Sequence, residues 1–180
     1  MRVITTPIKD LLLIEPKVFG DDRGYFYESY NEKLFHSNNV TANFVQDNIS
    51  KSSKGILRGL HFQTPPFTQG KLVKVIQGSV LDVAVDLRAA SPTFGQHFKM
   101  VLSEENHKMM WIPEGFAHGF LTLEDDTIFL YKCTNFYNAS ADRSILWNSP
   151  ELNIDWGITN PILSDKDRNG KTLNEFKGLF

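Results

Sequence analysis

Turn-forming sequences interrupt this chain at short intervals, and this spacing limits the elements that the chain can form. Such sequences include residues 20–24 (GDDRG), 38–39 (NN), 77–78 (QG), 91–92 (SP) and 124–126 (EDD). Short runs rich in Val, Ile, Leu, Phe and Thr lie between them, which is the pattern of short strands bounded by turns. Many short strands with almost no helix predict an all-β fold, either an antiparallel barrel or a jelly roll.

The clearest strand pattern covers residues 80–87 (VLDVAVDL). Apolar side chains at the odd positions alternate with a second face that presents Asp82 and Asp86, a period of two. Residues 127–137 follow a similar pattern and place Tyr131 and Tyr137 on one face if the strand stays regular. The only short helix that the sequence favours covers residues 31–37, with Asn31 as its N-cap.

The length of 180 residues suits one domain that spans residues 1–180. Hydrophobic residues make up 41% of the chain and include 14 Phe, which is enough bulky apolar volume for a core between sheets. The C-terminal thirty residues are polar and irregular, so we expect them to wrap across the barrel instead of forming a second domain.

Charge and composition argue against several classes of partner and compartment. A formal net charge of −2 gives no reason to expect binding to nucleic acid or to an anionic membrane. No stretch approaches the ~18 apolar residues that span a bilayer, and we see no signal-peptide pattern. Cys133 is the single cysteine, so an internal disulfide cannot form. We therefore expect a cytoplasmic protein.

Two segments match the motifs of the cupin superfamily. Residues 113–118 (PEGFAH) fit its second motif, Pro-x-Gly-x-x-His. Its first motif reads His-x-His, then an acidic residue and, after six more residues, a Gly. Here His61-Phe62-Gln63 is followed by Lys71 and Gly78, so Gln63 and Lys71 replace two of the four expected metal ligands.

These two replacements change the expected chemistry. An amide is a poor ligand for divalent transition metals, and an ammonium repels a cation. We therefore predict a cupin skeleton that uses no metal and no other cofactor. Lys71 would stabilise negative charge that develops on a substrate oxygen.

Seven segments in order along the chain resemble the dTDP-4-dehydrorhamnose 3,5-epimerase family, over residues 19–167. They are FGDDRGYFYE (19–28), VQDNISKSSKGILRGLHFQ (45–63), QGKLVKV (69–75), DVAVDLRAASPTF (82–94), WIPEGFAHGF (111–120), YKCTNFY (131–137) and LSDKD (163–167). The resemblance implies an antiparallel jelly-roll (cupin) barrel with a few short helices and a wrapping C-terminal tail. It also implies a homodimer, and the N-terminal segment is a candidate for a strand exchanged between subunits.

The resemblance further implies a substrate, dTDP-4-keto-6-deoxy-D-glucose, whose C3 and C5 hydrogens flank a ketone. His61 matches the family's base, and a pKa near 6.5 suits proton abstraction close to neutral pH. Asp167 matches the partner that orients His61. Lys71 would meet the enolate oxygen, and Tyr131 matches the acid that returns a proton.

The same resemblance implies the binding residues. Arg23 and Arg58 match contacts to the diphosphate and sugar, because a forked guanidinium fits anionic oxygens. Tyr137 matches the aromatic residue that stacks on thymine. The remaining implied contacts to nucleotide or sugar are Phe26, Glu28, the 46–48 turn (Gln46, Asp47, Asn48), Lys71, His118, Asp142 and Lys166. Asp82 either orients His118 or is a buried polar residue.

Three positions depart from the family's pattern. Asp142 stands where the family commonly has Glu, Ile49 where it often has His or another polar residue, and Phe62 where Tyr is common. None of the three is a proposed acid, base or enolate-stabilising group. The chemistry is therefore expected to be kept, whereas the choice of substrate is less constrained.

The resulting prediction is an epimerase that inverts C3 and C5 to give dTDP-4-keto-L-rhamnose, in dTDP-L-rhamnose biosynthesis. A single-carbon (C3) epimerase or a 3,4-ketoisomerase acting on a related nucleotide 4-ketosugar is the nearest alternative. From other classes, a metal-dependent cupin oxygenase and a non-enzymatic sugar-binding cupin remain. The oxygenase conflicts with Gln63 and Lys71, and the binding protein leaves the combination of His61, Lys71 and Tyr131 without a purpose.

Overall fold

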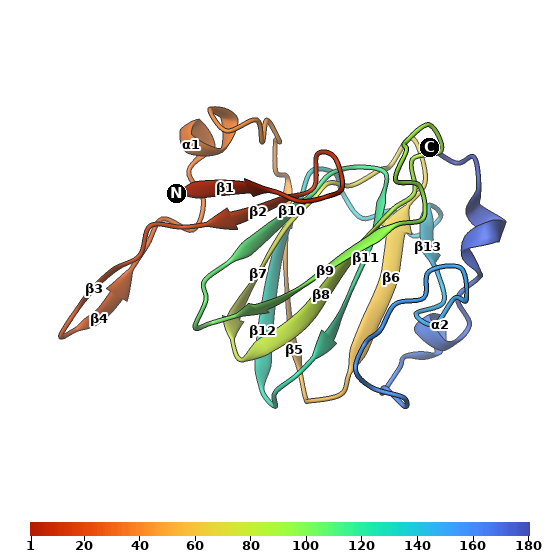
Figure 1. Cartoon of the computed structure of the whole chain (residues 1–180). Coiled ribbons are helices and arrows are strands. Elements are labelled where there is room, and N and C mark those ends of the chain that lie inside the picture. Colours follow the sequence, from red (N-terminus) through yellow and green to blue (C-terminus); the bar gives the residue numbers. More distant parts are fainter.

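The structure, a computed structural model, describes residues 1–180 and consists of two β-sheets that face one another (Figure 1). One sheet has six strands in the order β1 (Arg2–Thr5), β2 (Leu12–Glu15), β10 (Met109–Ile112), β7 (Lys71–Gln77), β12 (Thr127–Cys133) and β5 (Gln46–Ser52). The other has five, in the order β13 (Asp142–Ser144), β6 (Leu57–Gln63), β11 (Phe116–Thr122), β8 (Ser79–Asp86) and β9 (His97–Ser103). Neighbouring strands pair antiparallel, and the predicted all-β jelly-roll fold is confirmed.

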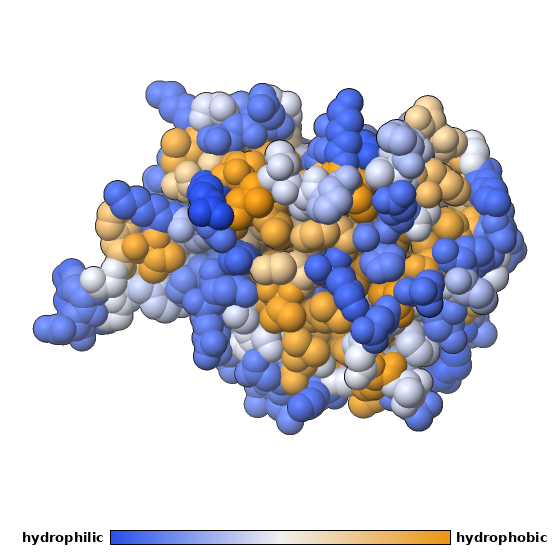
Figure 2. All heavy atoms as spheres, in the orientation of Figure 1, coloured by the Kyte–Doolittle hydropathy of each residue, from blue (hydrophilic) through white to orange (hydrophobic).

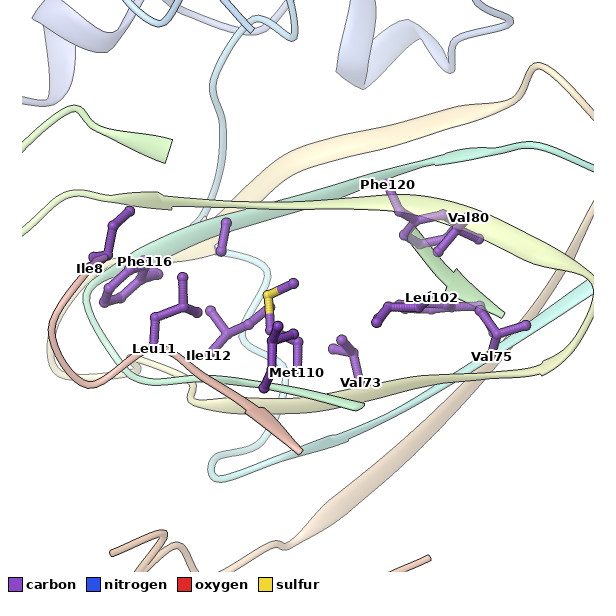
Figure 3. Close-up of a cluster of buried hydrophobic side chains, with 13 residues drawn as sticks. Ile8, Leu11, Val73, Val75, Val80, Leu102, Met110, Ile112, Phe116 and Phe120 are labelled. Carbon is purple, nitrogen blue, oxygen red and sulfur yellow. The ribbon is translucent and has the colours of Figure 1, made fainter. Parts of the chain in front are cut away.

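The barrel interior is filled by apolar side chains from both sheets (Figure 3). Val73 and Met110 of the six-stranded sheet meet Val80, Leu102 and Phe120 of the five-stranded sheet in one cluster. Each fully buried side chain of this size stabilises the fold by roughly 1.5–3 kcal/mol relative to an exposed one.

Strand β8 shows the predicted alternation, but neither of its faces meets solvent. Val83 and Val85 pack outward under the C-terminal tail, while Val80 and Ala84 point into the barrel. Asp86 is fully buried and accepts hydrogen bonds from the side chains of Arg88, Ser91 and Thr93. Burial alone would raise the pKa of Asp86, but these hydrogen bonds lower it to about 2.

The C-terminal tail wraps across the outer face of the five-stranded sheet, as predicted. It contributes Leu152, Trp156, Leu173 and Phe176 to a cluster with residues of β6, β8 and β11. The tail also contains two short helical elements, α2 (Asp165–Arg168) and the 3₁₀ helix η1 (Leu173–Phe176). A few short helices were expected from the family resemblance, but no sequence pattern placed these two. Segments this short carry no helical periodicity, so only their capping residues mark them.

The predicted short helix is present as α1 (Glu32–His36). The side chain of its N-cap, Asn31, accepts a hydrogen bond from the backbone N–H of Leu34. Phe35 on its inner face packs against the outer side of the six-stranded sheet. Neither the length nor the apolar content of any helix matches that of a membrane-spanning segment.

Two local expectations differ from the structure. The strand expected over residues 127–137 ends at Cys133, so Tyr137 lies in a loop and does not share the strand face of Tyr131. The Asn138 side chain closes that loop by accepting hydrogen bonds from the backbone N–H groups of Ser140 and Ala141. Residues 46–48, expected to form a turn, begin strand β5.

A two-stranded hairpin projects away from the barrel body (Figure 1). It consists of β3 (Phe19–Asp21) and β4 (Gly24–Phe26) and pairs with neither main sheet. Its aromatic side chains are uncovered: Tyr25 is 59% exposed and Phe26 is 67% exposed. Figure 2 shows apolar atoms at the surface of this arm. Burying apolar surface stabilises a protein, so such an arm is expected to meet another surface.

Candidate active site

Two cavities, of about 280 and 240 Å³, share His61, Lys71 and Tyr131 in their walls. These three residues come from β6, β7 and β12, so both sheets build the shared wall. The cavity of about 280 Å³, called the larger cavity, is also lined by the polar residues Gln46, Asn48, Gln63, Gln69, Tyr137, Asp142 and Lys166. Those of the smaller cavity are Ser50, Arg58, His118, Ser164 and Asp167.

Strand alternation explains most of this arrangement. Residues 46, 48 and 50 of β5 lie on the cavity side, as do His61 and Gln63 of β6. Arg58 is an odd number of positions from His61, yet it reaches the same cavity because the pairing of β6 with β11 shifts register between them. Gly59 lies at this irregularity, where a Cβ would be 2.4 Å from the Cα of Gly119.

His61 and Asp167 form a hydrogen-bonded pair between His61 Nε2 and Asp167 Oδ1. Asp167 enters from α2 and is only 3% exposed, and Ser164, the N-cap of that helix, donates to its other oxygen at 2.7 Å. Burial lowers the pKa of His61, and the nearby positive charges of Lys166 and Lys71 lower it further against the opposing effect of Asp167. Burial raises the pKa of Asp167, but the hydrogen bonds from His61 and Ser164 bring it below its ordinary value. A neutral imidazole beside an ionised carboxylate is the result at neutral pH.

Lys71 and Tyr131 line the same two cavities as His61. The Lys71 Nζ atom is 5.9 Å from the centroid of the Tyr131 ring. Burial lowers the pKa of Lys71 and raises the pKa of Tyr131. The site therefore holds a lysine side chain close to a phenol that keeps its proton to high pH.

His118 lies beside His61 as its direct partner across β6 and β11. Its Nε2 atom is 2.9 Å from Asp82 Oδ2, and both side chains are buried. Of the two readings of Asp82, the structure supports the one in which this carboxylate orients His118. The second oxygen, Asp82 Oδ1, has no hydrogen-bond partner within the chain.

Three of the predicted nucleotide contacts meet at one edge of the larger cavity. Lys166 Nζ lies 2.5 Å from Asp142 Oδ2, and the Tyr137 hydroxyl donates to the same oxygen at 3.2 Å. Asp142 is thus used by neighbouring side chains despite being shorter than the usual Glu. Tyr137 itself is 60% exposed, with its ring free to receive a ligand.

Four predicted contacts do not line either of the two cavities that share His61. Arg23, Phe26 and Glu28 are exposed on or beside the projecting hairpin, where Arg23 pairs with Asp21. Asp47 lies between Gln46 and Asn48 on β5, so strand alternation turns it to the opposite face of the sheet. There it pairs with Lys132 at 2.9 Å.

Sequence reasoning missed some of the cavity walls, namely Ser50, Gln69 and Ser164. Extending the alternation from Gln46 and Asn48 by two residues would have found Ser50. The N-cap pattern Ser-Asp-Lys-Asp at 164–167 would have found Ser164. Gln69 lies in a loop and had no such signal.

No group of three or more His, Cys, Asp and Glu side chains in the structure is arranged to hold a metal ion. Of the four positions of the cupin ligand set, only His61 and His118 carry ligand side chains, and each is hydrogen-bonded to a carboxylate. That the protein works without a metal ion stays a prediction.

A family model described as dTDP-4-dehydrorhamnose 3,5-epimerase matches residues 5–175. The chain belongs to this family. The epimerase of that name from Shigella flexneri is 55% identical over 172 residues, which cover 95% of each chain. The family resemblance of the seven sequence segments is thereby confirmed.

Two solved structures of epimerases share this architecture. The one from Bacillus anthracis, with TDP and PPi bound, is 52% identical, has a TM-score of 0.93, and is matched over 95% of this chain and 98% of its own. The one from Legionella pneumophila, in complex with dTDP-4-keto-L-rhamnose, is 50% identical with a TM-score of 0.92, over 96% of this chain and 93% of its own. The structural similarity therefore agrees with the family that the sequence comparison shows.

Proposed function

We propose that the chain inverts C3 and C5 of dTDP-4-keto-6-deoxy-D-glucose and so produces dTDP-4-keto-L-rhamnose for dTDP-L-rhamnose biosynthesis. The observation that carries this proposal is that His61, paired with Asp167, lines two adjoining cavities together with Lys71 and Tyr131, in a member of this epimerase family. These four residues supply a base, its orienting carboxylate, a cation and a phenolic acid. They are the groups that epimerisation beside a ketone requires.

We infer the following proton transfers from these residues. His61 Nε2 is engaged by Asp167, so Nδ1 is the nitrogen whose lone pair accepts the proton from C3 or C5. The electron pair of the broken C–H bond moves to the C4 oxygen, where the Lys71 ammonium stabilises the enolate. Tyr131 then donates its hydroxyl proton to the opposite face of the carbon, which inverts it, and proton exchange with solvent resets both groups.

The larger cavity and its edge would hold the nucleotide. Tyr137 offers an aromatic face for thymine, and Lys166 offers a positive charge for the diphosphate. Arg58 and His118 in the smaller cavity would contact the sugar and its neighbouring phosphate. The acid–base residues line the boundary between the two cavities, where the ketosugar ring would lie.

We infer that a second copy of the chain completes each site. Arg23, Phe26 and Glu28 belong to the expected ligand contacts, yet they lie on or beside an arm that projects away from the barrel (Figure 1). A two-fold homodimer allows each arm to reach the partner's cavity while the two interfaces stay equivalent. A cytoplasmic location stays a prediction.

Mixed dimers test whether the arm serves the partner. We expect His61→Asn chains and chains carrying Arg23→Ala with Phe26→Ala to have low activity as separate homodimers. A mixed dimer, purified through two different tags after co-expression, has one site with an intact base and an intact arm. It should therefore show about half of the unmodified dimer's activity. No recovery, or a chain that stays monomeric at assay concentrations, would contradict the exchange of arms.

Turnover by metal-stripped protein tests the proposed function and the expected lack of metal together. Protein treated with EDTA and passed into metal-free buffer should convert dTDP-4-keto-6-deoxy-D-glucose at the untreated rate, because Lys71 takes the role of the cation. Elemental analysis gives the metal content of both samples. Stoichiometric metal in the active sample, with activity lost to EDTA and restored by that metal, would favour the oxygenase-like cupin alternative.

A further inference from the structure

Gln63 occupies a position where the cupin pattern has a metal-binding histidine, and its side chain is committed to the protein backbone. Its Nε2 atom donates to the carbonyl oxygens of Phe67, at 2.6 Å, and of Phe136, at 3.2 Å. Its Oε1 atom accepts from the backbone N–H of Asn138 at 2.7 Å. The side chain is 4% exposed, so water does not compete for these bonds.

These three bonds hold the loop that presents Tyr137. Two of them fix the residues on either side of Tyr137, namely Phe136 and Asn138. The backbone N–H of Tyr137 itself donates to Gln46 Oε1 at 3.0 Å. The ring of Tyr137 is therefore exposed while its backbone is held at three consecutive residues.

The third partner, Phe67, belongs to the loop between β6 and β7, so Gln63 ties two loops together. Gln69 from the same loop donates to the carbonyl of Asn135 at 2.7 Å, which reinforces the connection. Of the three glutamines that hold the Tyr137 loop, only Gln63 lies on β6, the strand that carries His61. Residues two apart on a strand share a face, about 7 Å apart. The amide thus sets the position of the aromatic surface relative to the base.

Only an amide side chain can make all three hydrogen bonds at this position. Glutamine has one acceptor oxygen and two N–H donors, and the structure uses both kinds. A carboxylate would turn a negative charge toward two carbonyl oxygens and lose both donors. A histidine has at most one donor when its other nitrogen accepts.

We propose that Gln63 is a positioning residue for nucleotide binding, which holds the 134–138 loop so that Tyr137 is preorganised to receive the base of the nucleotide. The inference rests on the proposed function because it takes Tyr137 as the base-stacking residue. A preorganised ring loses less conformational freedom when ligand binds, so affinity depends on Gln63 even though Gln63 need not touch the ligand.

Binding of dTDP by isothermal titration calorimetry, together with steady-state kinetics, tests this proposal. Gln63→Met keeps the side-chain length and removes all three bonds, whereas Gln63→Glu keeps the shape and removes both donors. Each should raise the Kd for dTDP by about fivefold or more, toward the loss caused by Tyr137→Ala. The kcat at saturating substrate should stay within about threefold, because His61, Lys71 and Tyr131 are unchanged. Gln77→Met, at an exposed glutamine of β7, is the matched control and should change neither quantity.

A double-variant cycle separates positioning from general loosening of the protein. In the Tyr137→Ala background, Gln63→Met should add almost nothing to the Kd, because the group that it positions is gone. Additive effects, or a loss of kcat with unchanged dTDP affinity, would overturn the proposal. If Gln63→Glu does not fold, the neutral Gln63→Met variant carries the same test. Failure of the unmodified protein to bind dTDP would contradict the proposed function, whereas normal binding by both Gln63 variants would contradict only this inference.

Discussion

Replacing His61 with asparagine should lower epimerisation by at least ~10²–10⁴-fold, the range typical for loss of a general base. Asparagine keeps a similar size and one hydrogen-bonding group toward Asp167, but it has no nitrogen that can accept the substrate proton. Because the substitution leaves Tyr137, Lys166 and Arg58 in place, the Kd for dTDP should change little. Initial rates and dTDP titrations on the same preparations measure both effects.

The pH dependence of the unmodified protein supplies a second measurement on the same residue. Burial and neighbouring lysines lower the pKa of His61, and the proposed role as a base requires the unprotonated imidazole. The value of kcat/KM should therefore be constant near neutral pH and fall only below the ordinary histidine pKa of about 6.5. That acid limb should be absent from any residual activity of His61→Asn. A variant that retains more than about a tenth of the unmodified rate would show that His61 is not the base.

Replacing Tyr131 with phenylalanine should also have a large effect, roughly ~10²–10⁴-fold on turnover. The ring remains to pack beside Lys71 and Phe129, and only the proton donor is lost. Affinity for dTDP should stay nearly unchanged, because the proposed role of the hydroxyl is to donate a proton to the sugar and not to bind the nucleotide. Rates with the ketosugar nucleotide and calorimetry with dTDP measure the two quantities.

Tyr137→Ala is the matched comparison for Tyr131→Phe. It removes an exposed ring at the edge of the larger cavity and should weaken dTDP binding by roughly 1–3 kcal/mol, the usual cost of a lost base–aromatic stack. Its kcat should change far less than that of Tyr131→Phe. The reverse pattern, with Tyr131 governing affinity and Tyr137 governing turnover, would show that the two roles are exchanged.

The sequence predicted the parts of this structure that depend on local patterns. Alternation in residues 80–87 identified β8, and the capping preference of Asn31 identified α1. Family resemblance indicated that Asp167 approaches His61 from the tail, and the structure shows that contact. A motif can predict such a long-range contact because related chains bring the same segments together.

The sequence could not predict features that depend on how segments lie in space. Gln46, Asp47 and Asn48 read as one group of contacts, but the unrecognised strand directs Asp47 to the opposite face. Arg23 and Phe26 belong to a matching segment, and only the structure shows that their arm leaves the barrel. The hydrogen bonds of the Gln63 side chain to backbone groups could not be predicted either, because the three partner residues lie in two loops that have no regular sequence pattern.

The most direct test of the account follows solvent deuterium into the substrate. Both C3–H and C5–H lie next to the C4 ketone, so one base and one enolate-stabilising lysine serve both positions if the sugar ring moves between the two steps. In D₂O with dTDP-4-keto-6-deoxy-D-glucose, proton NMR should show loss of both the C3 and C5 signals and formation of the L-lyxo product. Exchange at C3 alone would make the chain a single-carbon epimerase, and a carbonyl moved to C3 would make it a ketoisomerase. No exchange at either carbon would contradict the assignment of this site to epimerisation.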